Sequence, residues 1–154
     1  MKNAAFLLFL ALAFTGCTRL SNQGLDQVKL AADVAAGSMV RLGGYTSFEW
    51  DRVFIFGPYT PPAAITEAVG SDVWFPHRDS ETHCLLVFRF HGKTVRAFEV
   101  DRNAADFEQL FQKTGYAREE ADFDVDVRAL DGWRFLKKND ALPIAKASAS
   151  DGSP

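Results

Sequence analysis

Segment Asp122–Arg128 restricts the fold more than any other part of the sequence, because its apolar and charged residues alternate without interruption. Phe123, Val125 and Val127 occupy every second position, and three aspartates and Arg128 occupy the others. Successive side chains of a β-strand point to opposite faces, so this pattern predicts a strand with one buried and one solvated face. Such a strand needs paired neighbours and an apolar layer that covers it. The chain is therefore expected to build a sheet.

Other segments supply candidates for the rest of that sheet. Segment 48–56 (FEWDRVFIF) is rich in aromatic and β-branched residues, and the apolar run at its end indicates burial on both faces. Segments 82–90 and 94–100 predict a hairpin, with Gly92 in the turn. A last short strand is predicted at Trp133–Leu136, after a turn at Asp131-Gly132. Segment 73–75 is either a short strand or part of a loop.

Three segments carry helical patterns. Residues 25–36 place apolar side chains at helical spacing and stop at Gly37. Residues 61–69 follow Thr60, a good N-cap, and begin with a proline, whose fixed φ suits the first turn. Residues 104–113, with Asn103 as the cap, align Phe107, Leu110 and Phe111 in a stripe. The order of elements predicts an α+β fold, an antiparallel sheet of about four to five strands with two to three helices packed on one face.

The N-terminus has the pattern of an export signal. Lys2 precedes an uncharged apolar run, residues 4–14, which as a helix is about 16 Å long and too short to span a bilayer. A positive start, a short apolar run and small residues at its end are typical of a secretory signal peptide. An ordinary secretory signal that happens to end near a cysteine would show the same pattern.

Residues Phe14-Thr15-Gly16-Cys17 resemble the lipobox of bacterial lipoproteins, although leucine is usual where Phe14 stands. The resemblance implies that residues 1–16 are removed and that Cys17 carries the lipid. Residues 17–24 would then form a tether, 25–138 a single α+β domain and 139–154 a disordered tail. Because Thr18 and not aspartate follows the cysteine, the sorting pattern of such lipoproteins implies a cell-envelope location at the outer membrane, facing the periplasm, in a Gram-negative source. In a Gram-positive source it implies the plasma membrane.

Composition and motifs argue against several classes of function. The formal net charge is −3 without a basic block, so nothing favours nucleic-acid binding. The spacing of Asp122, Asp124 and Asp126 starts like a calcium loop but lacks the required glycine and glutamate, and the histidines lack zinc-ligand spacing. No nucleophile or phosphate-loop motif is present, so we expect no catalytic residue, no cofactor and no metal.

Cys84 lies in a buried strand pattern and is expected to be an unpaired core thiol.

The remaining candidates are residues that could touch a partner. Tyr59 sits in the rigid run Gly57–Pro61, and Arg52 lies on the strand before it. With Trp74 and Trp133, these are the possible contact residues, because aromatic side chains anchor interfaces and Arg52 alternates with core residues and could reach the surface. For Tyr59 the alternative is that it covers the start of the following helix. The expected function is a non-enzymatic, membrane-anchored lipoprotein that contacts an envelope protein. The alternative is a binding module for a small ligand or envelope component, which needs a cavity between helix and sheet.

The run WDRVFIFGPYTPPAAITEAVG before a hydrophobic hairpin resembles a group of small uncharacterised bacterial lipoproteins. It resembles more loosely the outer-membrane assembly lipoproteins of the BamE (SmpA/OmlA) type, in which a strand, a turn with glycine and threonine, a helix ending in glycine and a hairpin recur. Gly57, Thr60 and Gly70 occupy comparable places, whereas Pro58-Tyr59 is an insertion and Pro62-Ala63 replaces polar helix residues. A shared fold would not transfer a function.

Overall fold

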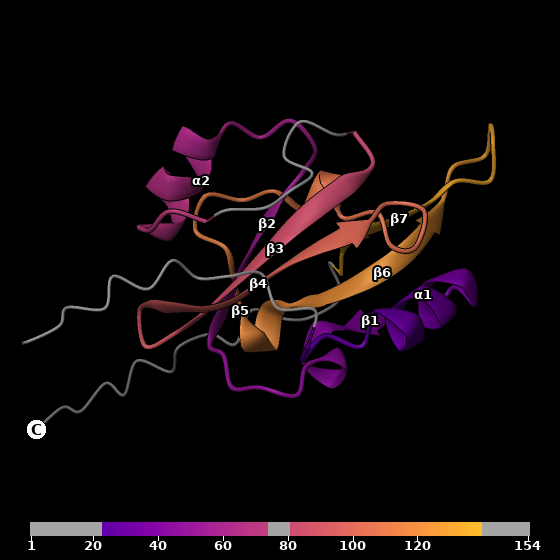
Figure 1. Ribbon diagram of the computed structural model, residues 1–154. Coiled ribbons are helices and arrows are strands. Elements are labelled where there is room, and N and C mark those ends of the chain that lie inside the picture. Colours follow the sequence, from indigo (N-terminus) through magenta and orange to yellow (C-terminus); the bar gives the residue numbers. More distant parts are fainter. Residues whose placement is uncertain (1–22, 74–80, 140–154) are drawn as a thin grey trace, which may run out of the picture.

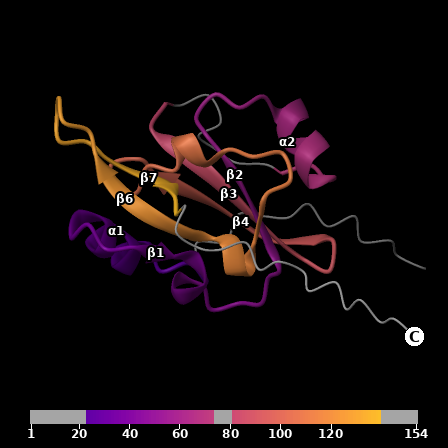
Figure 2. The ribbon, with the colours of Figure 1, turned by 180° about the vertical axis from the view of Figure 1, so that it is seen from behind.

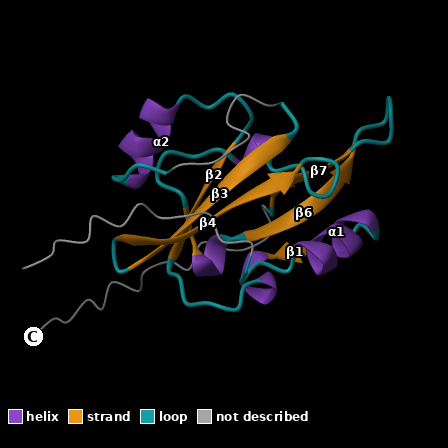
Figure 3. Ribbon diagram, viewed as in Figure 1, coloured by secondary structure: helices purple, strands orange, loops and turns teal. Residues whose placement is uncertain are grey.

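The computed structural model describes residues 23–73 and 81–139, in which helices and strands combine in an α+β arrangement (Figures 1 and 3). In chain order its elements are α1 (Gln27–Ala35), β1 (Val40–Arg41), η1 (Leu42–Tyr45), β2 (Arg52–Phe56), α2 (Pro62–Val69), β3 (His83–Phe90), β4 (Lys93–Asp101), η2 (Glu108–Leu110), β5 (Tyr116–Ala117), η3 (Arg118–Glu120), β6 (Asp122–Val127) and β7 (Arg134–Lys138), where η denotes a 3₁₀ helix.

The strands form two antiparallel sheets and not the single sheet that the sequence predicts. One sheet has four strands in the order β4-β3-β2-β5, and the other has three in the order β1-β6-β7. The predicted hairpin is confirmed as β3 and β4, which are joined by the two-residue loop His91-Gly92. Both loop residues have positive φ (49° and 75°), as the hairpin turns that match strand twist require.

The four-stranded sheet is buried on both faces, because its strands are apolar at consecutive positions. In β2, Val53 and Ile55 enter a larger core, whereas Phe54 and Phe56 enter a smaller one on the other face. Helix α2 covers the smaller core with Ile65 and its neighbours. The larger core is shared with α1, β1, β6 and β7. Two views of the ribbon place α1 and α2 on opposite sides of this sheet (Figures 1 and 2). The prediction that all helices pack on one face is therefore wrong.

Two helices begin and end close to their predicted positions. Asp26 caps α1, and its side chain accepts the Lys29 backbone N–H at 2.9 Å. Helix α2 ends at Gly70, which has the left-handed φ of 75° that a helix C-terminus favours. The predicted cap of α2 is displaced by one residue. Pro61 occupies the cap position, and the Thr60 hydroxyl donates to the Gly57 carbonyl at 2.8 Å instead.

The predicted helix over residues 104–113 is absent, and only the short 3₁₀ helix η2 forms there. Phe107 and Leu110 are buried as the apolar stripe requires, but Phe111 is half exposed. The Asp106 carboxylate accepts the Glu108 backbone N–H at 3.0 Å, and the Asp106 carbonyl accepts the Leu136 N–H at 2.8 Å. Short polar side chains that bond nearby backbone compete with helix formation, which explains the loss of the helix.

Strand β6 is confirmed, and it lies between β1 and β7. Phe123 is fully buried, but burial decreases along the strand until Val127 is 48% exposed. The aspartates between them have polar partners. Asp122 faces Arg41 at 3.5 Å, Asp126 binds Lys137 at 2.7 Å, and Asp124 accepts the Asn139 amide at 3.3 Å. These carboxylates therefore pair with neighbouring strands and the chain that follows β7.

Candidate functional site

The turn at the end of β2, residues Gly57–Thr60, is hereafter called the Tyr59 turn. Tyr59 has a positive φ of 58°, a conformation that is uncommon for any residue other than glycine. Its side chain is 60% exposed. The hydrogen bond from the Thr60 hydroxyl to the Gly57 carbonyl closes the turn, and two prolines follow it. The turn thus holds an exposed aromatic residue in a fixed and strained backbone.

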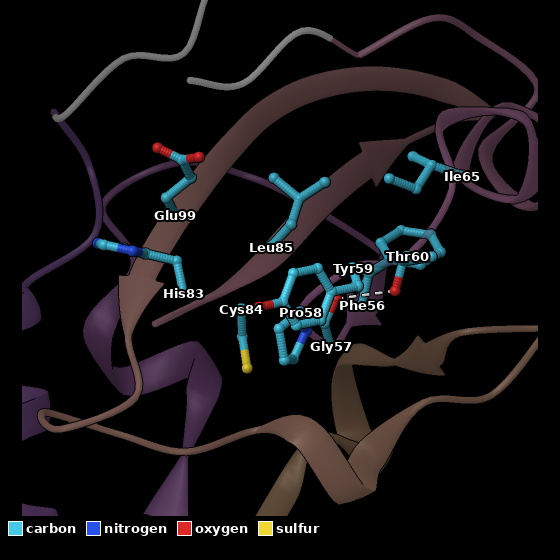
Figure 4. A pocket seen from close by; sticks show the side chains of 10 residues that line it. All are labelled: Phe56, Gly57, Pro58, Tyr59, Thr60, Ile65, His83, Cys84, Leu85 and Glu99. Atoms are coloured by element: carbon cyan, nitrogen blue, oxygen red, sulfur yellow. Dashed lines mark hydrogen bonds between the residues drawn. The ribbon is translucent and has the colours of Figure 1, made fainter. Parts of the chain in front are cut away.

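The Tyr59 turn and the start of β3 border a small cavity (Figure 4). Its lining residues are Phe56, Gly57, Pro58, Tyr59, Thr60, Ile65, His83, Cys84, Leu85 and Glu99. The Leu85 and Cys84 side chains point to opposite faces of the strand (Figure 4). The cavity volume is ≈ 10 Å³, which holds about one water molecule. This space between α2 and the sheet is too small for an organic ligand.

A second exposed aromatic ring lies at the same end of β2. Phe111 is 50% exposed, and its ring centroid lies 6.0 Å from that of Phe56, the last residue of β2. Beyond it, Lys113 forms an ion pair with Glu67 of α2 at 3.1 Å. Phe111 therefore packs against the last residue of the strand that leads into the Tyr59 turn. Tyr59 and Phe111 are both exposed aromatic residues.

Trp133 has an internal role that the sequence did not reveal. Its indole N–H donates to the Asp106 carboxylate at 2.8 Å, and its ring lies 6.0 Å from the Arg102 guanidinium. Arg102 binds both oxygens of Asp106, at 3.1 and 2.9 Å, and also pairs with Glu108. Asp106 itself is 3% exposed. Trp133 is therefore a partly buried member of a polar cluster that fastens β7 to the end of β4.

Hydrogen bonds in this cluster keep Asp106 charged, and burial keeps Cys84 neutral. Burial alone would raise the pKa of Asp106, but hydrogen bonds from Arg102, Glu108 and Trp133 outweigh it and lower the pKa. Burial raises the pKa of the Cys84 thiol to about 12. Cys84 is free, 1% exposed and 3.9 Å from the Asp106 carboxylate. The predicted unpaired core thiol is confirmed, and at neutral pH it is not a nucleophile.

Open hollows flank this cluster. One of ≈ 430 Å³ lies between α1 and the turn before β7, and one of ≈ 240 Å³ lies beside Glu108 and Phe135. Both are lined by Arg102 and Trp133, whose polar groups are already bonded within the cluster. Within the described ranges, no group of three or more His, Cys, Asp or Glu side chains is arranged to hold a metal ion.

The other candidate residues are spread over the molecule. Arg52 starts β2, at the end of the strand remote from Tyr59, and donates to the Thr114 carbonyl at 2.7 Å. Trp74 and the lipid-attachment candidate Cys17 lie outside the described residues. In the part of the chain that is described, no helix is long and apolar enough to cross a lipid bilayer.

Comparison with known proteins gives no relative from which a role could be transferred. No protein-family model matches the sequence, and the chain matches none of the curated proteins and none of the solved structures with which it was compared. The resemblances to lipoproteins stay predictions from the motifs quoted above. A proposal for function therefore depends on the residues themselves.

Proposed function

We propose that this chain is a bacterial lipoprotein, anchored through lipid on Cys17, whose folded domain acts by contact with another envelope protein at the Tyr59 turn. The motif Phe14-Thr15-Gly16-Cys17 supports the anchor. The observation that carries the contact site is Tyr59, which is exposed and held in a left-handed backbone conformation.

Two physical costs at Tyr59 support a role in recognition. A left-handed conformation costs about 1–2 kcal/mol for a residue with a Cβ atom, and strained residues cluster at functional sites. An exposed aromatic ring also leaves apolar surface in water, which burial against a partner would remove. Because the turn is already rigid, binding there would lose little conformational entropy. Tyrosine at a pre-organised turn is the type of residue that dominates interface energies.

The anchor limits where a partner can lie. Segment 17–25 can extend about 28 Å, at roughly 3.5 Å per residue, so the domain stays close to the membrane. The chain enters the fold next to α1, whereas α2, which follows the Tyr59 turn, lies on the opposite side of the four-stranded sheet (Figure 1). The Tyr59 turn is then available to a protein in the periplasm.

Photo-crosslinking in cells tests this site. A photoreactive amino acid at position 59 should give one reproducible adduct, and the same amino acid at position 130 should not give it. Leu130 is the matched control because it is 91% exposed and lies in a turn between β6 and β7. Mass spectrometry of the adduct identifies the partner.

A variant then tests whether the aromatic ring of Tyr59, and not only the shape of the turn, makes the contact. With the photoreactive residue moved to exposed position 63, Tyr59→Asn should reduce the adduct more than about tenfold, as loss of an interface anchor does. Asparagine tolerates the left-handed conformation, so the turn should keep its shape. Equal adducts from positions 59 and 130, or an adduct that Tyr59→Asn leaves unchanged, would refute the contact site.

A further inference from the structure

Two arginines face each other at the other end of the four-stranded sheet. Arg52 of β2 and Arg89 of β3 are direct partners in the antiparallel register. They follow the alternation of Phe54 and Val87, so they share the face that α2 covers further along the sheet. Like charges placed opposite each other on paired strands are destabilising. A solvent-open hollow of ≈ 290 Å³ lies there, lined by Asp51, Arg52, Arg89 and Gly92.

Both arginines donate to backbone carbonyls. Arg52 donates to the Thr114 and Gly115 carbonyls at 2.7 and 3.5 Å, and Arg89 donates through Nη2 to the Gly92 carbonyl. The Nε of Arg89 is buried without a hydrogen-bond partner, which is a costly arrangement. Asp51 accepts the His91 backbone N–H at 2.7 Å. Within residues 23–73 and 81–139, neither arginine forms an ion pair with a carboxylate.

A phosphate group could accept hydrogen bonds from the Arg89 Nε, which lacks a partner, and could neutralise both guanidinium groups. The planar guanidinium matches the oxygens of a phosphate in a two-bond arrangement, and this bond is strong because both partners are charged. If Arg89 turned from Gly92 toward the hollow, its Nε and Nη2 could donate together to one phosphate. The same anion would offset the repulsion between Arg89 and Arg52.

We propose that the hollow between Arg52 and Arg89 binds the phosphate of an anionic membrane lipid. The position of the tether favours a lipid over a free phosphate, and this step depends on the proposed lipid at Cys17. Gly24, where the chain enters the fold, lies close against the Phe48 ring. A Cβ atom added to Gly24 would be only 2.9 Å from that ring. The Phe48 ring packs on Phe88, the neighbour of Arg89, with centroids 5.2 Å apart. The tether therefore starts at the same end of the sheet as the two arginines but on its other face, because Phe88 enters the larger core whereas Arg89 follows the alternation of Val87.

This contact would orient the domain. Segment 17–24 reaches at most about 25 Å, so a domain that stands with this end of the sheet toward the bilayer keeps the hollow close to the lipid surface. Each basic residue near an anionic bilayer strengthens binding to that bilayer about fivefold. Anchoring supplies a high local lipid concentration, so a weak phosphate contact is sufficient. With Arg52 toward the lipid, the Tyr59 turn at the far end of β2 points away from the bilayer.

Arginine modification on the full, lipidated protein tests this proposal. The protein is reconstituted into vesicles of phosphatidylcholine with or without phosphatidylglycerol, or kept in detergent with or without inorganic phosphate, and reacted with phenylglyoxal. We expect phosphatidylglycerol to slow modification of Arg52 and Arg89 about fivefold relative to phosphatidylcholine. Arg128, on the far turn before β7, is the internal control and should change little.

A second readout uses Lys93, the exposed first residue of β4. Phosphatidylglycerol should slow acetylation of Lys93 in the wild type and in Arg128→Gln, but not in the double variant Arg52→Gln and Arg89→Gln. Equal protection by inorganic phosphate in detergent would refute a lipid source, and protection in none of the mixtures would refute the site. The mass of the starting protein reports acylation of Cys17 independently, and crosslinking at Tyr59 reports the partner. Failure of this inference is therefore distinguishable from failure of the proposed function.

Discussion

Asp106→Ala is expected to lower the free energy of unfolding by about 3–5 kcal/mol, the range measured when one member of a buried ion pair is removed. The carboxylate is 3% exposed and accepts hydrogen bonds from Arg102, Trp133 and the Glu108 backbone. Alanine leaves these donors without their acceptor in a partly buried site, and unmade hydrogen bonds there carry the desolvation cost. It also removes the side-chain bond from Asp106 to Trp133, whereas the backbone bond from Leu136 to the carbonyl of residue 106 remains.

Urea unfolding followed by circular dichroism measures this effect. Asp126→Ala is the control, because its ion pair with Lys137 is solvent-exposed and such pairs contribute little. We expect the Asp126 variant to keep most of the wild-type stability. Equal losses in the two variants would show that the Asp106 cluster does not hold the domain together.

The same carboxylate predicts an acid dependence of stability. Its pKa in the folded state is below that of the unfolded chain, about 3.9. The unfolded state therefore binds the proton more readily, so this contribution is present above pH 4 and is lost as the pH falls below it. Asp106→Asn should unfold with a weaker dependence on pH below about 4 than the wild type. An unchanged acid dependence in Asp106→Asn would contradict the assigned charge state.

Gly115→Ala is expected to lower the free energy of unfolding by about 3 kcal/mol. Gly115 precedes β5 and has φ of 63°, where a Cβ atom alone costs about 1–2 kcal/mol. That Cβ would also lie 2.6 Å from the Val53 carbonyl oxygen and 3.1 Å from the Phe54 ring. Relief of the overlap requires a backbone shift between β5 and β2, and overpacking of this kind costs about 1–3 kcal/mol.

Gly132→Ala is the matched control for this substitution. Its φ is 71°, but nothing lies within 4 Å of the added Cβ. Gly132→Ala should therefore lower the free energy of unfolding by only about 1 kcal/mol, the cost of the left-handed conformation. The difference between the two variants in thermal or urea unfolding isolates the close approach at β2. If both variants lose the same stability, the packing of β5 on β2 is not as tight as described.

The local elements of this fold can be predicted from sequence where the hydrophobic pattern agrees with the prolines and glycines that begin or end an element. The hairpin of β3 and β4 follows from two apolar runs with Gly92 between them, and α2 follows from its prolines and Gly70. The predicted helix at 104–113 is wrong because its apolar stripe looks helical, whereas Asp106 uses its polar groups to bind other elements. Strands β1 and β5 are two residues long, which is too short for any periodicity.

The arrangement of elements was less predictable than the elements themselves. Consecutive apolar residues at the end of β2 indicate burial on both faces, but they do not say which helix covers each face. Division into two sheets depends on pairings between distant segments, such as β1 with β6.

The same limit applies to the candidate sites. The rigid run around Tyr59 is visible in sequence, whereas the opposition of Arg52 and Arg89 appears only once the register of β2 and β3 is known. Trp133 looks like a contact residue in sequence, but its N–H is bonded to Asp106 in the fold.

The mass of the N-terminal peptide of the protein purified from membranes tests the proposed anchor most directly. The account predicts that residues 1–16 are absent, that the chain starts at Cys17, and that this cysteine carries diacylglycerol and an additional acyl chain. Cys17→Ala should leave the chain unacylated. A mature protein that starts elsewhere, or that starts at Cys17 without lipid, would contradict the lipoprotein assignment.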